Sequence, residues 1–147
     1  MRVTIIASGS AGNVTLLQAG KTAVLIDIGL SAKRINGHLN THGVEANTLA
    51  GVLLTHEHGD HTKGLRVFSA NSSVPVFTNP LTADSLRKSA IDTEWRLFNS
   101  GSAFEIAELR IQPFSVPHDA ADGGSSGGGG ASAGRAPDPV YGDEEPF

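Results

Sequence analysis

The sequence contains no cysteine among its 147 residues. This absence excludes a structural disulfide, a thiolate metal ligand and a thiol nucleophile, and with them the small secreted scaffolds that disulfides hold together. Any soft-metal ligand must therefore be histidine, of which the chain has six.

Long apolar runs are missing as well. No stretch reaches the roughly 18 uninterrupted apolar residues that a membrane-spanning helix requires. The apolar start of the chain also meets the polar Ser8 too early for a signal peptide. We therefore expect a soluble, cytoplasmic protein.

Acidic charge is scarce in most of the chain and concentrated at its end. Residues 1–118 carry a net charge of +1, whereas residues 119–147 carry −5. The nearly neutral part gives no electrostatic evidence for a nucleic-acid partner. After Asp122 the sequence becomes GGSSGGGG, a linker composition with no side chains to bury. The composition predicts one folded domain over residues 1–122 and a disordered, Gly-rich, acidic tail over residues 123–147.

Strand and helix patterns alternate along the domain, which predicts an α/β (α+β) fold. Apolar runs predict strands at residues 3–6, 14–17, 23–26, 49–55, 74–77, 94–97, 103–106 and 109–112. We expect the last three to be antiparallel strands with one solvated face. Capping residues predict helices from Ser31 to about His42 and from Asn79 to Lys88, and the apolar residues from Leu65 to Phe68 indicate a shorter one.

Four ligand-type side chains follow the predicted strand at residues 49–55, in the segment HEHGDH at residues 56–61. His56 and His58 point to the same side of an extended stretch, and a sharp bend at Gly59 would bring Asp60 and His61 to a second point nearby. Imidazole and carboxylate without thiolate suit zinc, manganese or iron in hydrolytic sites, where two metals lie about 3.5 to 4 Å apart. We predict that His56, His58, Asp60 and His61 bind metal, that a metal-bound hydroxide is the nucleophile, and that Asp60 positions it. A His-rich surface loop is the disfavoured alternative, because all four residues follow a buried strand.

Two polar residues outside this cluster are further candidates for the site. His118 ends the segment that starts at Phe114 and would complete a three-histidine set with His56 and His58. Asp27 stands at a predicted strand end, where it either orients a ligand imidazole, the reading we favour, or forms a turn before the next glycine.

Two further segments have competing interpretations. His38 and His42 have the spacing of some helical zinc sites but lack the accompanying glutamate, so we expect both to be exposed to solvent. The glycine loop at residues 8–13 would either place hydroxyls and backbone donors near the site or serve as a simple hairpin loop, and we favour the hairpin.

The segment HEHGDH, preceded by LLT at residues 53–55, resembles the HxHxDH signature of metallo-β-lactamase-fold hydrolases. The segments ASGSAGN at residues 7–13, LIDIGLS at 25–31 and VPHDA at 116–120 are similar to the WalJ/YycJ-like branch of that superfamily. The resemblance covers residues 1 to about 122. It implies the first half of a four-layer αββα sandwich, a binuclear metal centre of zinc or manganese, and exonuclease-like hydrolysis of phosphodiester bonds in DNA, with RNA as the alternative substrate.

The resemblance also implies how the ligands are shared. His56, His58 and His118 would hold one metal, and Asp60 and His61 would contribute to the other. The family supplies a further bridging aspartate and a later histidine, and no histidine follows His118 here. We therefore expect about one bound metal, an exposed apolar face on the uncovered sheet, and a partner or C-terminal half that completes the fold.

Two hypotheses explain the low-complexity residues near the end of the chain. In the one we favour, residues 123–144 are a low-complexity insert within a longer protein cut off at Phe147; in the other, the product is a natural fragment. The functional alternatives are a thioester or lactone hydrolase of the same fold, because metal ligands do not encode the substrate, and a catalytically incompetent metal-binding fragment.

Overall fold

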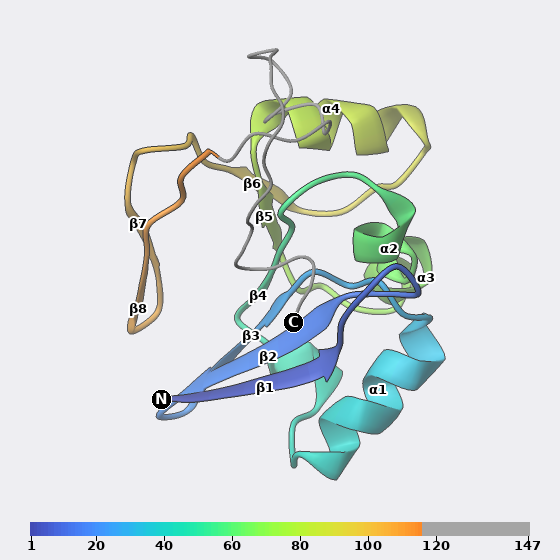
Figure 1. The fold of residues 1–147 in the computed structure, drawn as a ribbon, viewed down its shortest axis with the longest axis vertical. Helices are drawn as coiled ribbons and strands as arrows, with labels where there is room; N and C mark the ends of the chain where they lie inside the picture. The colour runs from blue at the N-terminus through green and yellow to red at the C-terminus, as the bar shows by residue number, and fades with distance from the viewer. Residues whose placement is uncertain (116–147) are drawn as a thin grey trace.

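A computed structural model describes residues 1–115 of the chain (Figure 1). His118 and the predicted tail at residues 123–147 lie outside the described residues. The strands are β1 (Arg2–Ala7), β2 (Val14–Ala19), β3 (Thr22–Ile26), β4 (Gly51–Leu53), β5 (Val76–Thr78), β6 (Trp95–Leu97), β7 (Phe104–Ile106) and β8 (Leu109–Ile111). The helices are α1 (Ala32–Thr41), α2 (Gly59–Thr62), α3 (Leu65–Ala70) and α4 (Pro80–Lys88), with a 3-10 turn at Ala46–Thr48. Within residues 1–115, none of these helices has the length and apolar character needed to cross a membrane.

Six strands form the main sheet in the order β1-β2-β3-β4-β5-β6. The first three are antiparallel neighbours, whereas β3 to β6 run parallel to one another. The prediction that residues 94–97 form an antiparallel strand is therefore wrong, because Trp95 pairs in parallel with Val76 of β5. Helix α4 connects these two strands, and a crossover of that kind returns the chain to the same end of the sheet. The antiparallel prediction for β7 and β8 is confirmed, since they pair as a separate hairpin.

Alternate residues of the central strands pack into two different apolar clusters. Leu25, Val52 and Val76 belong to the cluster that contains the buried side chains of α1, α3 and α4. Their neighbours in sequence point to the other face of the sheet, where Val24, Leu53 and Phe77 pack with residues of the β7-β8 hairpin. Helices thus cover one face of the sheet and the hairpin covers part of the other (Figure 1).

The predicted caps of the two longer helices are confirmed. The Ser31 hydroxyl accepts a hydrogen bond from the Arg34 backbone N–H at the start of α1, at 3.3 Å. The Asn79 side chain accepts one from the Thr82 backbone N–H at 2.8 Å, with Pro80 at the first helical position of α4. Gly43, at φ 73°, follows α1 in the left-handed conformation that ends a helix.

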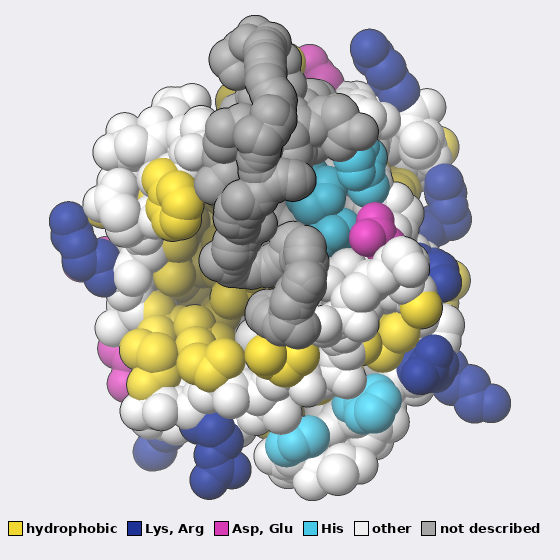
Figure 2. Space-filling model, viewed as in Figure 1, with side chains coloured by type: hydrophobic (Ala, Val, Ile, Leu, Met, Phe, Trp, Pro, Cys, Tyr) yellow, Lys and Arg dark blue, Asp and Glu magenta, His cyan; other side chains and the backbone are white. Residues whose placement is uncertain are grey.

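Part of the apolar surface of the sheet is uncovered. Val3 and Ile5 of the edge strand β1 are 60% and 52% exposed. Figure 2 shows hydrophobic side chains gathered on the face of the molecule where β1 lies in front, with histidine and acidic side chains grouped on another part of the same face. This agrees with the predicted exposed apolar face.

Candidate metal centre

The polar residues of the site follow three neighbouring parallel strands. Asp27 comes directly after β3, the HEHGDH segment begins three residues after β4, and Asn79 comes directly after β5. Carboxyl ends of adjacent parallel strands lie at the same edge of a sheet, where α/β proteins place their ligand sites. Backbone bonds hold this edge together, since the Asp27 N–H donates to the Leu53 carbonyl at 2.7 Å and the Ile28 N–H to the His61 carbonyl at 2.9 Å.

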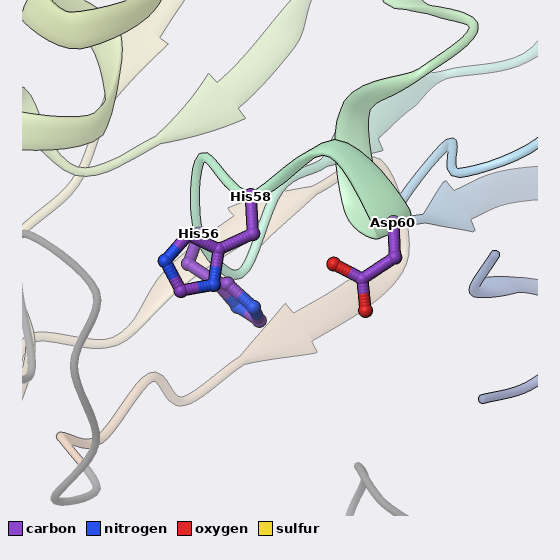
Figure 3. Close-up of side chains that lie close together, drawn as sticks. All are labelled: His56, His58 and Asp60. Atoms are coloured by element: carbon purple, nitrogen blue, oxygen red, sulfur yellow. The ribbon is translucent and has the colours of Figure 1, made fainter. Parts of the chain in front are cut away.

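Three of the predicted ligands converge (Figure 3). His56, His58 and Asp60 are half-buried, and each offers one ligand atom within 4.8 Å of the others. The chain reaches this arrangement differently from the prediction, because Gly59 begins the short helix α2 with His58 at its N-cap instead of forming a sharp bend. A single helical turn places Asp60 in its first turn and His61 on the buried side, so a glycine in an unusual conformation is unnecessary.

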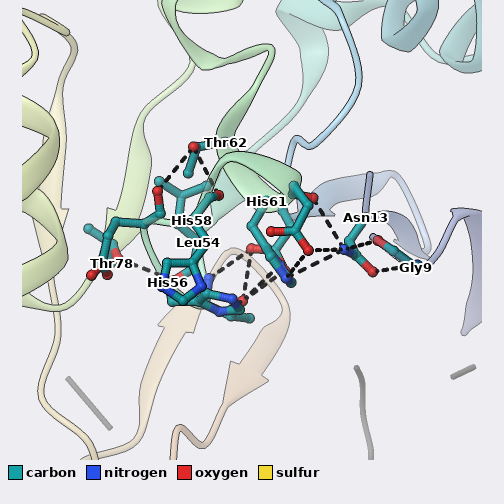
Figure 4. Close-up of polar contacts among 12 residues, drawn as sticks. Gly9, Asn13, Leu54, His56, His58, His61, Thr62 and Thr78 are labelled. Carbon is teal, nitrogen blue, oxygen red and sulfur yellow. Dashed lines mark hydrogen bonds and ion pairs between the residues drawn. The ribbon is translucent and has the colours of Figure 1, made fainter. Parts of the chain in front are cut away.

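The fourth residue, His61, is buried and oriented by Asp27. Its Nδ1 lies 2.6 Å from Asp27 Oδ2. A carboxylate only accepts, so Nδ1 carries the proton of this contact, and in the neutral ring Nε2 then keeps its lone pair. Nε2 faces Asp60 Oδ2 at 3.5 Å and Asn13 Nδ2 at 3.4 Å (Figure 4). The structure therefore places Asp27 where the sequence predicted it, behind a ligand-type imidazole.

Asp27 also turns the chain after β3. Its φ of 65° lies in the left-handed region, which costs free energy but is tolerated by aspartate more often than by most residues. The Asp27 carboxylate is buried and accepts from the Thr55 N–H at 2.8 Å and from the Thr55 hydroxyl at 2.8 Å. The two interpretations of this residue therefore hold together, because the turn aims the carboxylate that contacts His61.

Threonine hydroxyls tie down the HEHGDH segment, a feature that the sequence analysis missed. Thr62 donates to the His58 carbonyl at 3.1 Å, and Thr78 donates to the Leu54 carbonyl at 3.2 Å (Figure 4). Thr82, at the start of α4, donates to Glu57 Oε1 at 3.4 Å. The Thr62 contact is local, four residues along the chain, whereas Thr78 and Thr82 bond segments that approach them only in the folded chain.

The glycine loop at residues 8–13 both connects the β1-β2 hairpin and reaches the site. The Asn13 carboxamide contacts Asp60 and His61. The hairpin interpretation is right about the connection, but Asn13 itself was not singled out from the sequence. The ASGSAGN segment was the available signal.

His38 lies on α1 and His42 is its C-cap residue, and both are half-buried, so the expectation that they are exposed is wrong. The His42 Nδ1 lies 2.9 Å from the His38 carbonyl oxygen. The same carbonyl also accepts from the His42 backbone N–H at 3.2 Å, so the ring adds a second contact to the last turn of the helix. The pair is therefore engaged in ending the helix.

The donor set at the strand ends suits a divalent cation. Imidazole nitrogens and a carboxylate oxygen converge without thiolate, as in zinc and manganese sites. The lone pair of His61 Nε2 faces the same group, because its other nitrogen is engaged by Asp27. The assignment of His56, His58, Asp60 and His61 as ligands stays a prediction, as does that of His118, which lies outside the described residues.

Comparisons with known proteins agree with this architecture. Residues 7–142 match the model of the metallo-beta-lactamase superfamily. The chain is 31% identical over 125 residues to exodeoxyribonuclease YycJ of Bacillus anthracis, and the alignment covers 83% of this chain and 47% of the relative. It is 32% identical over 124 residues to exodeoxyribonuclease WalJ of Streptococcus pneumoniae, covering 81% of this chain and 46% of the relative.

The fold also matches solved structures. The metallo-beta-lactamase fold protein YhfI of Bacillus subtilis superimposes with a TM-score of 0.65 at 19% identity, over 80% of this chain and 53% of that protein. The chain spans about half the length of the curated relatives it matches. The family match agrees with the histidine segment at the strand end and with a sheet covered by helices on one face. The chain therefore belongs to the metallo-beta-lactamase superfamily.

Proposed function

We propose that this chain carries the cation-binding part of a metal-dependent hydrolase that cleaves phosphodiester bonds in nucleic acid, as an exonuclease does. One observation carries the proposal: the donor group of His56, His58 and Asp60 lies at the end of β4 in a chain similar to two exodeoxyribonucleases. DNA is the expected substrate, with RNA as the alternative.

The residues of the site have separate roles in this proposal. His56, His58 and His118 would hold one cation, and Asp60 and His61 would contribute to a second. Zinc or manganese bound there would polarise the phosphoryl group and lower the pKa of a water molecule. Asp60 would position that water for attack. Asp27 would keep Nε2 of His61 aimed at the site, because its carboxylate accepts the hydrogen bond from Nδ1.

Metal binding is the first test. We expect the 147-residue chain to bind about one equivalent of zinc after dialysis, measured by elemental mass spectrometry, because the described donors form one group. His58→Ala should remove this binding, since it deletes one of few donors. His38→Ala is the matched control, because His38 lies on α1 and should leave metal content unchanged. Unchanged metal content in His58→Ala would overturn the site assignment.

Hydrolysis is the second test. The zinc- and manganese-loaded chain should cleave single-stranded DNA slowly, lose this cleavage in His58→Ala, and leave a thioester intact. Cleavage of the thioester without cleavage of DNA or RNA would replace the nuclease proposal with the thioester or lactone hydrolase. A bound cation with no turnover on any of the three substrates would favour the metal-binding fragment without activity.

A further inference from the structure

The carboxamide of Asn13 lies against Asp60 and His61, the last two residues of the HEHGDH segment (Figure 4). Asn13 Nδ2 is 3.3 Å from Asp60 Oδ2 and 3.2 Å from the Asp60 carbonyl oxygen. The same nitrogen is 3.4 Å from His61 Nε2. It also donates to the Gly9 carbonyl at 2.8 Å, and Asn13 Oδ1 accepts from the Gly9 N–H at 3.1 Å.

The donors and acceptors around this side chain agree with one another. An amide nitrogen has two protons and no lone pair to offer, so each group that faces it must be an acceptor. The Asp60 carboxylate and the Gly9 carbonyl are acceptors, and so is His61 Nε2 in the neutral ring whose Nδ1 donates to Asp27. A flipped carboxamide would set its oxygen against the oxygens of Asp60 and its nitrogen against the Gly9 N–H, so the network selects the observed orientation.

Backbone contacts fix the position from which Asn13 acts. Its N–H donates to the Asp60 carbonyl at 2.8 Å, and its carbonyl accepts from the Gly29 N–H at 3.0 Å. A Cβ atom on Gly29 would overlap the Asp60 carbonyl, so the turn after β3 lies directly against this junction. Asn13 is therefore held on both sides by segments that belong to the site.

We propose that Asn13 is a positioning residue of the cation site. By donating to Asp60 Oδ2 it sets the rotation of the carboxylate that forms a donor group with His56 and His58, and it faces the lone pair of His61. The inference rests on the cation site of the proposed function and is independent of the substrate. Residues that orient metal ligands commonly contribute a factor of 10 to 100 in metal affinity.

The test measures cation binding by the full 147-residue chain. Asn13→Ala should weaken zinc binding by about 10- to 100-fold in calorimetric titration and change the visible absorption of the cobalt-loaded protein, because Asp60 loses its donor. Asn71→Ala is the matched control. Its Nδ2 also donates to a backbone carbonyl, that of Val67 at 2.9 Å, but at the end of α3. Zinc affinity in Asn71→Ala should stay within about twofold of the unsubstituted chain.

The outcomes separate the two proposals. If Asn13→Ala folds and its zinc affinity equals that of Asn71→Ala, the role of Asn13 is overturned and the cation site remains supported. Absence of zinc binding in the unsubstituted chain would overturn the cation site and this inference together.

A second measurement serves if Asn13→Ala does not fold. In the unsubstituted chain, zinc should shift the side-chain amide resonances of Asn13 together with the ring nitrogen resonances of His61. The zinc-free ring should show the tautomer protonated on Nδ1. Amide resonances of Asn13 that do not move at zinc saturation, or a His61 ring protonated on Nε2, would overturn the inference.

Discussion

His61 and Asp27 form a buried polar pair at the site. Their relative exposures are 8% and 5%, and the 2.6 Å contact joins Nδ1 to Oδ2. The carboxylate also accepts from the backbone N–H and hydroxyl of Thr55. One side chain therefore fixes the tautomer of an imidazole and the start of the segment that carries His56 and His58.

Removal of the Asp27 carboxylate should affect both binding and folding. We expect Asp27→Ala to weaken zinc binding by about 10- to 100-fold, because His61 loses the partner that orients it. The free energy of unfolding should fall by about 1 to 3 kcal/mol, since the buried His61 ring and the Thr55 backbone N–H lose their acceptor. Calorimetric titration and urea unfolding of the metal-free chain measure the two effects.

Asp84→Ala is the matched control for this aspartate. Asp84 is an exposed residue of α4 whose carboxylate lies 3.5 Å from Arg87. Its removal should change the free energy of unfolding by no more than about 0.5 kcal/mol and leave zinc affinity alone. An Asp27→Ala chain with normal zinc affinity would contradict the orienting role.

At the scale of elements, the turn after β3 is packed against the start of α2. Gly29 lies between the Asp60 carbonyl and the Asn13 backbone, and an added Cβ would come within 2.5 Å of the Asn13 nitrogen. Both neighbours are backbone atoms, which cannot move aside as a flexible side chain can. Close packing of a turn, a glycine loop and a short helix thus aligns three segments that are distant in sequence.

Two glycine substitutions should change the free energy of unfolding in opposite directions. We expect Gly29→Ala to lower the free energy of unfolding by about 1 to 3 kcal/mol, because the methyl group forces backbone segments apart. Gly37→Ala should raise it by about 0.5 to 1 kcal/mol, since Gly37 lies inside α1 with open space around its Cα. Urea unfolding of the metal-free chains compares them. Equal stability of the two variants would contradict the close packing at Gly29.

At the scale of the whole molecule, the sheet has one well-covered face and one face covered in part. The helices bury residues of every strand from β2 to β5, whereas the β7-β8 hairpin packs with Val24, Leu53 and Phe77 on the opposite side. Val3 and Ile5 lie on the edge strand β1 and stay exposed. An apolar edge of this kind favours association between chains.

Association should therefore depend on β1. We expect Val3→Thr combined with Ile5→Thr to reduce concentration-dependent self-association, measured by sedimentation velocity. Threonine keeps the branched shape that suits a strand. Leu81→Gln, at an exposed position of α4, is the control and should leave association unchanged. Association that persists unchanged in the double variant would contradict the role of β1.

Local patterns predicted most elements correctly. They failed where a segment distant in sequence sets the direction of a strand or the partner of a side chain. The caps at Ser31 and Asn79 act on neighbouring residues, so the sequence shows them directly. The direction of β6 depends on the crossover through α4, which short alternation at residues 94–97 cannot reveal. The contact of Asn13 with Asp60 is hidden for the same reason, because the two residues are 47 positions apart.

The sequence by itself determined the chemistry available to this protein: no thiolate, and histidines with an aspartate grouped after one apolar strand. That grouping also indicated the superfamily, which the comparisons confirm. Only the tertiary structure decided which groups meet that segment. Asp27 reaches His61 across 34 residues because β3 and β4 pair in parallel and end at the same edge. Side-chain periodicity reports neighbours along one element, whereas these contacts depend on how strands pair and on where each of them stops.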